Sequence, residues 1–294
     1  MKQELVIGVI GGSGVYDLDG LSDVREVELA TPFGAPSDAY ITGSLHGARM
    51  VFLPRHGRGH RINPSEINFR ANLWGMKKLG VRRIVSLSAV GSMREDIHPG
   101  HFVVIDQFFD RTRHRADTFF ENGVVAHVMF ADPVCARVRA PLVATGKSLG
   151  LTIHDGGTYI NMEGPQFSTR AESRIYRGWG VDVIGMTNLQ EAKLAREAEI
   201  CYATVAMATD YDCWHEGHDD VTVEGILAVM RTNTVNAKHL ITAVVPGLQD
   251  PSPCACESAL ANAIMTAPER IDAAARDRLG LLIGKYLPRD TRGG

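Results

Sequence analysis

The sequence of 294 residues has no long apolar run. The apolar stretch near the N-terminus, Leu5 to Ile10, is followed by glycines and Asp17 instead of the apolar core and small-residue cleavage site of a secretion signal. No stretch approaches the roughly 18 uninterrupted apolar residues that cross a bilayer. We therefore expect a cytoplasmic protein without a membrane partner.

The sequence also lacks an excess of basic residues. Lys and Arg number 31 against 34 Asp and Glu, which gives a formal net charge of -3. A surface that binds a polyanion usually carries an overall basic excess. This balance argues against nucleic acid as the main partner.

Cysteine is scarce, with only five in the chain. Cys254 and Cys256 form a C-x-C motif without a second ligand pair at zinc-finger spacing, so the spacing does not predict a zinc site. Two interpretations stay open for Cys135, Cys201, Cys254 and Cys256: reduced thiols, or two disulfides of the kind found in cytosolic proteins of hyperthermophiles. The odd number leaves at least one thiol free.

The residues that are present favour a single α/β domain covering residues 1–294. Of the residues, 45% are hydrophobic, and a chain of this length can bury about 75% of its unfolded surface. Apolar, β-branched runs that alternate with helical patterns predict a mixed, mostly parallel central sheet flanked by helices on both faces. The predicted strands lie at 5–10, 49–53, 83–87, 102–105, 159–162, 181–186 and 200–208, and the predicted helices at 64–79, 133–149, 169–179, 188–199 and 223–245, followed by a final helix after 268.

Three strand ends carry groups that suit an oxyanion. Gly11-Gly12-Ser13-Gly14 offers bare amides and a hydroxyl, whereas Asp17 stands where a dinucleotide fingerprint needs a third glycine. Arg55 and His56 follow the strand that ends at Leu53, and a guanidinium fork with an imidazole N–H suits a phosphate. Ser88 and its small neighbours close another strand. Each segment also has an alternative without a bound anion. For the glycine segment it is a tight turn, for Arg55 and His56 a solvated basic loop, and for Ser88 close packing.

Asp210-Tyr211-Asp212 ends the strand from Ile200. Strand alternation places both carboxyls on one side, with Tyr211 opposite. Two carboxyls in a half-buried site tend to share one proton, which provides an acid for a leaving group at neutral pH. Solvated carboxylates in a turn are the alternative.

Glu163 to Ser168 connects a predicted strand to a predicted helix. In this connection Phe167 can stack on a flat heterocycle, and Ser168 can bond to the edge of that heterocycle. An ordinary β-α connection with Phe167 in the core is the alternative.

Together these motifs resemble the purine nucleoside phosphorylase family, and most closely its members that act on methylthioadenosine. The matching segments run in order from about residue 5 to 245: Ile10 to Gly14, Thr31 to Gly34, Arg55 to Arg58, Ala71 to Trp74, Ser88 to Ser92, Asp106 to Phe108, Glu163 to Ser168 and Met207 to Trp214.

The resemblance implies phosphorolysis of a purine nucleoside without a cofactor or metal. Phosphate attacks C1′, and adenine and 5-methylthioribose 1-phosphate are released. The resemblance also implies a role for each site residue: phosphate binding by Ser13, Arg55, His56, Ser88, Ala89 and Thr187, ribose contact by Met186, base contact by Phe167, Ser168, Asp210 and Asp212, and catalysis by a protonated Asp210. The alternatives are a broad purine nucleoside phosphorylase acting on adenosine, inosine or guanosine, and a phosphate-independent nucleosidase.

The family pattern further implies a shared site in a homotrimer or a dimer of trimers. Val223, Ile226 and Leu227 follow the acid pair at roughly helical spacing and are expected to form the apolar 5′ pocket. His127 of a neighbouring subunit is expected to complete it. One departure from the pattern is Gly185, where many of these enzymes carry Asn, so the breadth of base selection stays open.

Overall fold

A computed structural model of the chain describes residues 5–12, 14, 15, 17–215 and 223–288. In these residues it contains eleven strands and six α-helices. The strands are β1 (Val6–Gly11), β2 (Ser22–Val27), β3 (Tyr40–Leu45), β4 (Ala48–Pro54), β5 (Val81–Ser92), β6 (Phe102–Val104), β7 (Gln107–Arg111), β8 (Ile153–Asp155), β9 (Thr158–Met162), β10 (Val183–Gly185) and β11 (Cys201–Asp210). The helices are α1 (Phe69–Lys78), α2 (Ala136–Ser148), α3 (Arg170–Gly178), α4 (Asn188–Glu197), α5 (Val223–Val244) and α6 (Ala273–Ile283).

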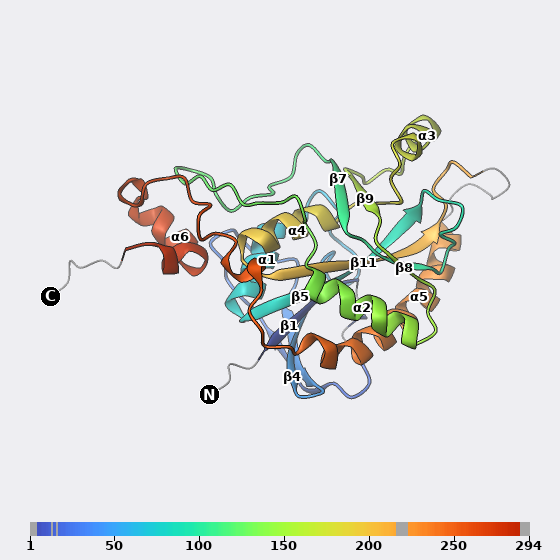
Figure 1. The fold of residues 1–294 in the computed structure, drawn as a ribbon, viewed down its shortest axis with the longest axis horizontal. Helices are drawn as coiled ribbons and strands as arrows, with labels where there is room; N and C mark the ends of the chain where they lie inside the picture. The colour runs from blue at the N-terminus through green and yellow to red at the C-terminus, as the bar shows by residue number, and fades with distance from the viewer. Residues whose placement is uncertain (1–4, 13, 16, 216–222, 289–294) are drawn as a thin grey trace.

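All described strands belong to one mixed sheet. Its main path runs β2-β3-β4-β1-β5-β10-β9-β7, while β11 pairs with β5 and β6, and β8 pairs with β6. Parallel pairings join β4, β1, β5 and β11, and antiparallel pairings join β5 to β10 and β11 to β6. The long strand β5 is therefore the centre of the molecule (Figure 1). The prediction of a mixed, mostly parallel sheet is confirmed.

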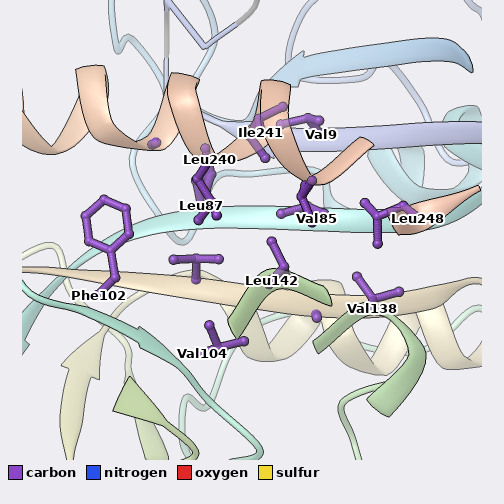
Figure 2. Packing of buried hydrophobic residues seen from close by; sticks show 14 of the residues in the cluster. Val9, Val85, Leu87, Phe102, Val104, Val138, Leu142, Leu240, Ile241 and Leu248 are labelled. Carbon is purple, nitrogen blue, oxygen red and sulfur yellow. The ribbon is translucent and has the colours of Figure 1, made fainter. Parts of the chain in front are cut away.

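Helices cover both faces of this sheet, as predicted. On one face Val138 and Leu142 of α2 and Leu240 of α5 pack against strand residues such as Val85 and Leu87 (Figure 2). On the other face apolar residues of α1, α4 and α6 form a second cluster with β1, β4 and β5. Apolar area removed from water on both sides stabilises the sheet and fixes the strand ends that carry polar residues.

Helix α1 begins at Phe69, so the prediction of a start at Pro64 is wrong. The Asn68 side chain accepts a hydrogen bond from the Ala71 amide and caps the helix, as a short polar side chain does at this position. Residues 64–66 instead form a turn after Asn63, whose side chain accepts a hydrogen bond from the Ser65 amide. Because Ser65 is outside the helix, its hydroxyl reaches Glu163 Oε1 at 2.7 Å.

Strands β2, β3, β7 and β8 were not predicted. Strand β2 lies at the edge of the sheet and is almost wholly exposed, with the sequence Ser-Asp-Val-Arg-Glu-Val, so it lacks the apolar run that marks a buried strand. The predicted final helix is confirmed as α6, and the segment before it contains only short 3-10 turns. Among the described helices, none has the length and apolar character that crossing a membrane requires.

Candidate active site

The candidate site lies where the parallel strands β1, β4, β5 and β11 end. The carboxyl ends of parallel strands meet at one edge of a sheet, which is where such folds bind ligands. Gly91, near the end of β5, pairs with Asp210 of β11 and with Ile184 of β10. A Cβ atom on Gly91 would lie 3.0 Å from Asp210 Oδ1 and 3.3 Å from the Cβ of Asp212. The absence of a side chain at Gly91 therefore lets both acids approach the strand.

Three of the predicted phosphate ligands lie beside this edge. Ser88 is buried and Ala89 is half-buried near the end of β5, and the Ser88 hydroxyl lies 3.3 Å from the Tyr159 hydroxyl. Thr187 is the N-terminal residue flanking α4, but its side chain makes no capping bond to the helix. A helix N-terminus with an available hydroxyl favours an anion, since the amides and the dipole both point to it. Ser13 lies outside the described residues.

Arg55 is not a free cation, contrary to the argument from the sequence. Its Nε donates to Glu191 Oε1 at 2.7 Å, and the side chains of this ion pair are only 4% and 1% exposed. Its Nη2 donates to Ser86 Oγ at 2.6 Å, and its Nη1 donates to the Leu87 carbonyl at 2.6 Å. Burial alone would lower the pKa of Arg55, but the Glu191 carboxylate outweighs burial and raises it. Five N–H groups on a guanidinium leave one on Nη1 for a ligand.

The ring of His56 also has an internal partner. Its Nδ1 lies 2.8 Å from the Ile62 carbonyl, which can only accept, so Nδ1 carries the proton. Burial and the adjacent Arg55 charge lower the pKa of His56 to about 4. The ring is therefore neutral at pH 7 and presents Nε2 as an acceptor, rather than the imidazole N–H that the sequence argument assumed.

Sequence reasoning missed the acid that neutralises Arg55. Glu191 on α4 accepts from Arg55, from Ser86 Oγ at 2.7 Å and from the Tyr202 hydroxyl at 3.0 Å. The Asn188 side chain closes this buried network with a bond to Ser86 Oγ at 2.7 Å. In the sequence Glu191 is only a polar residue on one face of a predicted helix, and most such residues are solvated. Its pairing with Arg55 therefore could not be predicted without the fold.

Arg115 is a second residue that the sequence analysis missed. Its side chain is 1% exposed, and its Nε donates to Glu163 Oε1 at 3.1 Å. Its other nitrogens donate to the carbonyls of Glu163 and Met186 and to Gln190 Oε1. Arg115 thus joins the predicted base-binding connection to the predicted ribose contact Met186.

Asp210 and Asp212 lie together, but strand alternation is not the reason. The strand ends at Asp210 after an irregularity in its pairing with β5, and Asp212 occupies a turn with a positive φ of 52°. The Asp212 amide donates to Asp210 Oδ1 at 2.8 Å, and Thr209 Oγ1 donates to Asp210 Oδ2 at 2.7 Å. The turn, rather than the pleat, brings the acids to one place.

The pKa of each of these two acids is raised, whereas the sequence analysis expected one shared proton, and the main cause is burial rather than mutual repulsion. Burial raises the pKa of Asp210 and exceeds the opposing effect of the Thr209 hydroxyl and the Asp212 amide. Burial also raises the pKa of Asp212, and repulsion by Asp210 adds a smaller part. Desolvation disfavours the charged form of a carboxyl, so each side chain keeps its proton to a higher pH than a solvated carboxyl does.

The predicted base-binding connection approaches the acids. Ser168 is half-buried, and its carbonyl lies 3.4 Å from the Sγ of Cys213, the residue after Asp212. Phe167 is 54% exposed, so the alternative in which it belongs to the core is wrong. Met186 covers Gly164, where a Cβ atom would meet the Met186 sulfur at 2.5 Å.

Close packing against Tyr159 explains why residue 185 is glycine. A Cβ atom on this residue would lie 1.9 Å from the hydroxyl oxygen of Tyr159 and 2.5 Å from the ring carbon that bears it. Tyr159 is fully buried in β9, directly beside β10, and its hydroxyl faces Ser88. The tyrosine thus occupies the space that a side chain at position 185 would take.

We expect Gly185→Ala to lower the free energy of unfolding by about 1–3 kcal/mol, because it overpacks a buried site. Combining it with Tyr159→Val, which vacates the space, should cost less than the sum of the two single changes. Gly280→Ala in α6 is the control, since a Cβ there meets nothing within 4 Å. Denaturant unfolding of all four variants measures the coupling. Simple additivity would show that the two positions do not compete for space.

The predicted 5′ pocket is only partly described. Leu227 on α5 is 48% exposed, and the side chains of Val223 and Ile226 lie outside the described residues. His127 is exposed, and its amide donates to the carbonyl of Ala263 at 2.8 Å. The described contacts of His127 thus join it to the segment before α6, not to the acids after β11.

Sequence comparisons identify relatives along nearly the whole chain. A model of the phosphorylase superfamily matches residues 6–246. The S-methyl-5′-thioadenosine phosphorylase of Geobacter sulfurreducens is 62% identical over 285 residues, which cover 97% of this chain and 100% of the relative. The protein of the same name from Koribacter versatilis is 55% identical, with 98% of each chain covered.

Solved structures agree with these relatives. A methylthioadenosine phosphorylase from an antarctic soil metagenomic library superposes with a TM-score of 0.91 at 44% identity, covering 96% of this chain and 99% of that one. The methylthioadenosine phosphorylase of Schistosoma mansoni in complex with adenine gives 0.83 at 35% identity, covering 89% and 99%. The chain therefore belongs to the phosphorylase superfamily and, within it, to the S-methyl-5′-thioadenosine phosphorylase family.

Proposed function

We propose that the chain cleaves S-methyl-5′-thioadenosine by phosphorolysis and releases adenine and 5-methylthio-α-D-ribose 1-phosphate. The family supports this activity, and the observation that carries the chemistry is the pair of half-buried acids beside Gly91. The ionised neighbour of the neutral acid favours a 6-amino purine, because a carboxylate only accepts, an amino group donates and a 6-oxo group accepts.

In the proposed step phosphate attacks C1′ as the glycosidic bond breaks. The purine leaves as a nitrogen anion, and a neutral Asp210 stabilises it by donating a proton toward N7. The phosphate supplies the nucleophile and a negative charge close to the developing cation on the sugar. The proposed phosphate ligands are the amide and hydroxyl groups around Ser88 and Thr187, with the remaining Nη1 N–H of Arg55. The step needs no metal or cofactor.

Turnover of four nucleosides, with and without phosphate, tests this function. The substrates are methylthioadenosine, adenosine, inosine and guanosine, and the readouts are kcat/KM and product identity. We expect phosphate-dependent release of adenine and a preference for methylthioadenosine. Comparable inosine turnover would favour a broad purine nucleoside phosphorylase. Equal adenine release without phosphate would replace the proposal with a nucleosidase.

We also propose a homotrimer or dimer of trimers, in which His127 of one subunit completes the 5′ pocket of the next. This fits the exposed position of His127 and its attachment to the C-terminal segment. Sedimentation of the native protein tests it, and a monomer with full activity would contradict it. We further propose that the protein is located in the cytoplasm.

A further inference from the structure

Four cysteines gather at the end of the sheet opposite the candidate active site. Cys135 flanks the N-terminus of α2, Cys201 is the first residue of β11, and Cys254 and Cys256 lie at the start of the 3-10 turn Ala255–Ser258. The four sulfur atoms all lie within 4.8 Å of one another, and the Sγ atoms of Cys135 and Cys254 are 3.6 Å apart. Three distant segments therefore meet in one cluster of thiols.

The spacing of the sulfur atoms fits a tetrahedral metal ion. Zn²⁺ binds thiolates at about 2.3 Å, which places the sulfurs of a tetrahedral set about 3.8 Å apart. A disulfide needs a sulfur–sulfur distance of about 2.05 Å. All four thiols are free in the structure, and their separations, 3.6 Å for Cys135 and Cys254 and within 4.8 Å for the whole set, are closer to the tetrathiolate spacing than to a disulfide.

Two arginines hold the C-x-C segment from either side. Arg137 on α2 donates to the carbonyls of Ser252 and Pro253 at 2.9 and 2.5 Å. Arg82 on β5 forms an ion pair with Glu257 at 2.6 Å. These contacts lie directly before and after the C-x-C motif, so the ligands are positioned by the surrounding protein before any ion binds.

A buried positive charge beside the cluster provides an independent observation. Arg83 is 1% exposed and pairs in register with Cys201 in the parallel strands β5 and β11. Its guanidinium donates to the carbonyls of Leu248 and Asp250, and its Nε has no acceptor. In the described part of the chain no carboxylate lies within ion-pair distance of it. A buried charge of this kind is costly unless an opposite charge compensates it.

We propose that Cys135, Cys201, Cys254 and Cys256 form a structural tetrathiolate site for Zn²⁺. Four thiolates around one Zn²⁺ carry a net negative charge, which complements Arg83, whereas two disulfides carry none. Binding releases the thiol protons to solvent, because the thiolate is the ligand. The ion would link the C-terminal segment to α2 and β11. It would lie about 30 Å from Asp210, at the other end of β11, and would take no part in phosphorolysis.

The metal content of the native protein tests this site. After purification without chelators, we expect about one Zn²⁺ per chain by plasma mass spectrometry. The mass of the denatured, unreduced chain should correspond to five free thiols. A mass lower by four hydrogens, from two disulfides, would overturn the proposal, and so would free thiols in a protein without metal.

Cysteine variants assign the ion to the cluster. Cys256→Ser should lose the Zn²⁺, whereas Cys213→Ser, whose thiol lies outside the cluster, should retain it. If Cys256→Ser does not fold, replacing Zn²⁺ by Co²⁺ in the unaltered protein gives a second measurement. We expect the intense visible absorption of tetrahedral Co²⁺ with sulfur ligands. A Co²⁺ spectrum without sulfur charge transfer, or Zn²⁺ retained by a folded Cys256→Ser protein, would show that the ion binds elsewhere.

Discussion

Asp210→Asn should reduce kcat for release of adenine from methylthioadenosine by about 10²- to 10⁴-fold, the usual contribution of a positioned general acid. The amide has the shape of the acid but cannot transfer its proton. An amide can also donate to a 6-oxo group, so we expect the remaining activity to shift toward inosine. Steady-state kinetics on both nucleosides measures the change. Unaltered kinetics on methylthioadenosine would remove Asp210 from the catalytic role.

The pH dependence of kcat separates an acid from a residue that merely shapes the pocket. Burial raises the pKa of Asp210, so the neutral form persists to higher pH than for a solvated carboxyl. The rate should fall as pH rises through that pKa, and Asp210→Asn should lack this decline. Asp277→Asn, an exposed acid on α6, is the matched control and should keep the full profile. A decline shared by all three proteins would assign it to another group.

Glu191→Ala should lower the free energy of unfolding by about 3–5 kcal/mol, because it leaves Arg55 buried without a counter-charge. The change also removes the acceptor for Ser86 and Tyr202. We further expect a higher KM for phosphate, since the unpaired guanidinium is no longer held at the ends of β1 and β5. Denaturant unfolding and phosphate titration measure the two effects.

The chain offers an exposed ion pair as the control for this prediction. Glu26 accepts from Arg58 at 2.7 Å, but both side chains are about half exposed. Screening by water makes such a pair worth about 0–1 kcal/mol, so Glu26→Ala should have little effect on unfolding. Equal losses for Glu191→Ala and Glu26→Ala would show that burial does not govern the Arg55 pair.

The strand ends show which parts of the site were predictable. Apolar runs ending in glycine, serine or aspartate are local patterns, and parallel strands bring their carboxyl ends to one edge. The sequence therefore placed Ser88, Asp210 and the loop at Arg55 on one side of the sheet. It could not reveal that Glu191 neutralises Arg55, because that pair joins residues 136 positions apart.

The predictions from the sequence were wrong where a local hydrogen bond competed with the residue pattern on which the prediction rested. Pro64 suggested a helix start, yet Asn68 provides a better cap. Alternation suggested that Asp210 and Asp212 share one strand face, yet a turn at Asp212 places the second acid. The imidazole N–H expected of His56 is used by the Ile62 carbonyl. In each case the deciding hydrogen bond was invisible in the residue pattern.

The sequence by itself determined the α/β class and the family and proposed Asp210 and Asp212 as the acids, because hydrophobic periodicity and ordered motifs are properties of the chain. Only the tertiary structure decided the direction in which the pKa values of Arg55, His56 and Asp210 shift, since burial and distant partners cause these shifts. It also decided that the cysteines meet. Ligand spacing along the chain argued against a metal, whereas the folded sheet brings four sulfurs from three segments within 4.8 Å of one another.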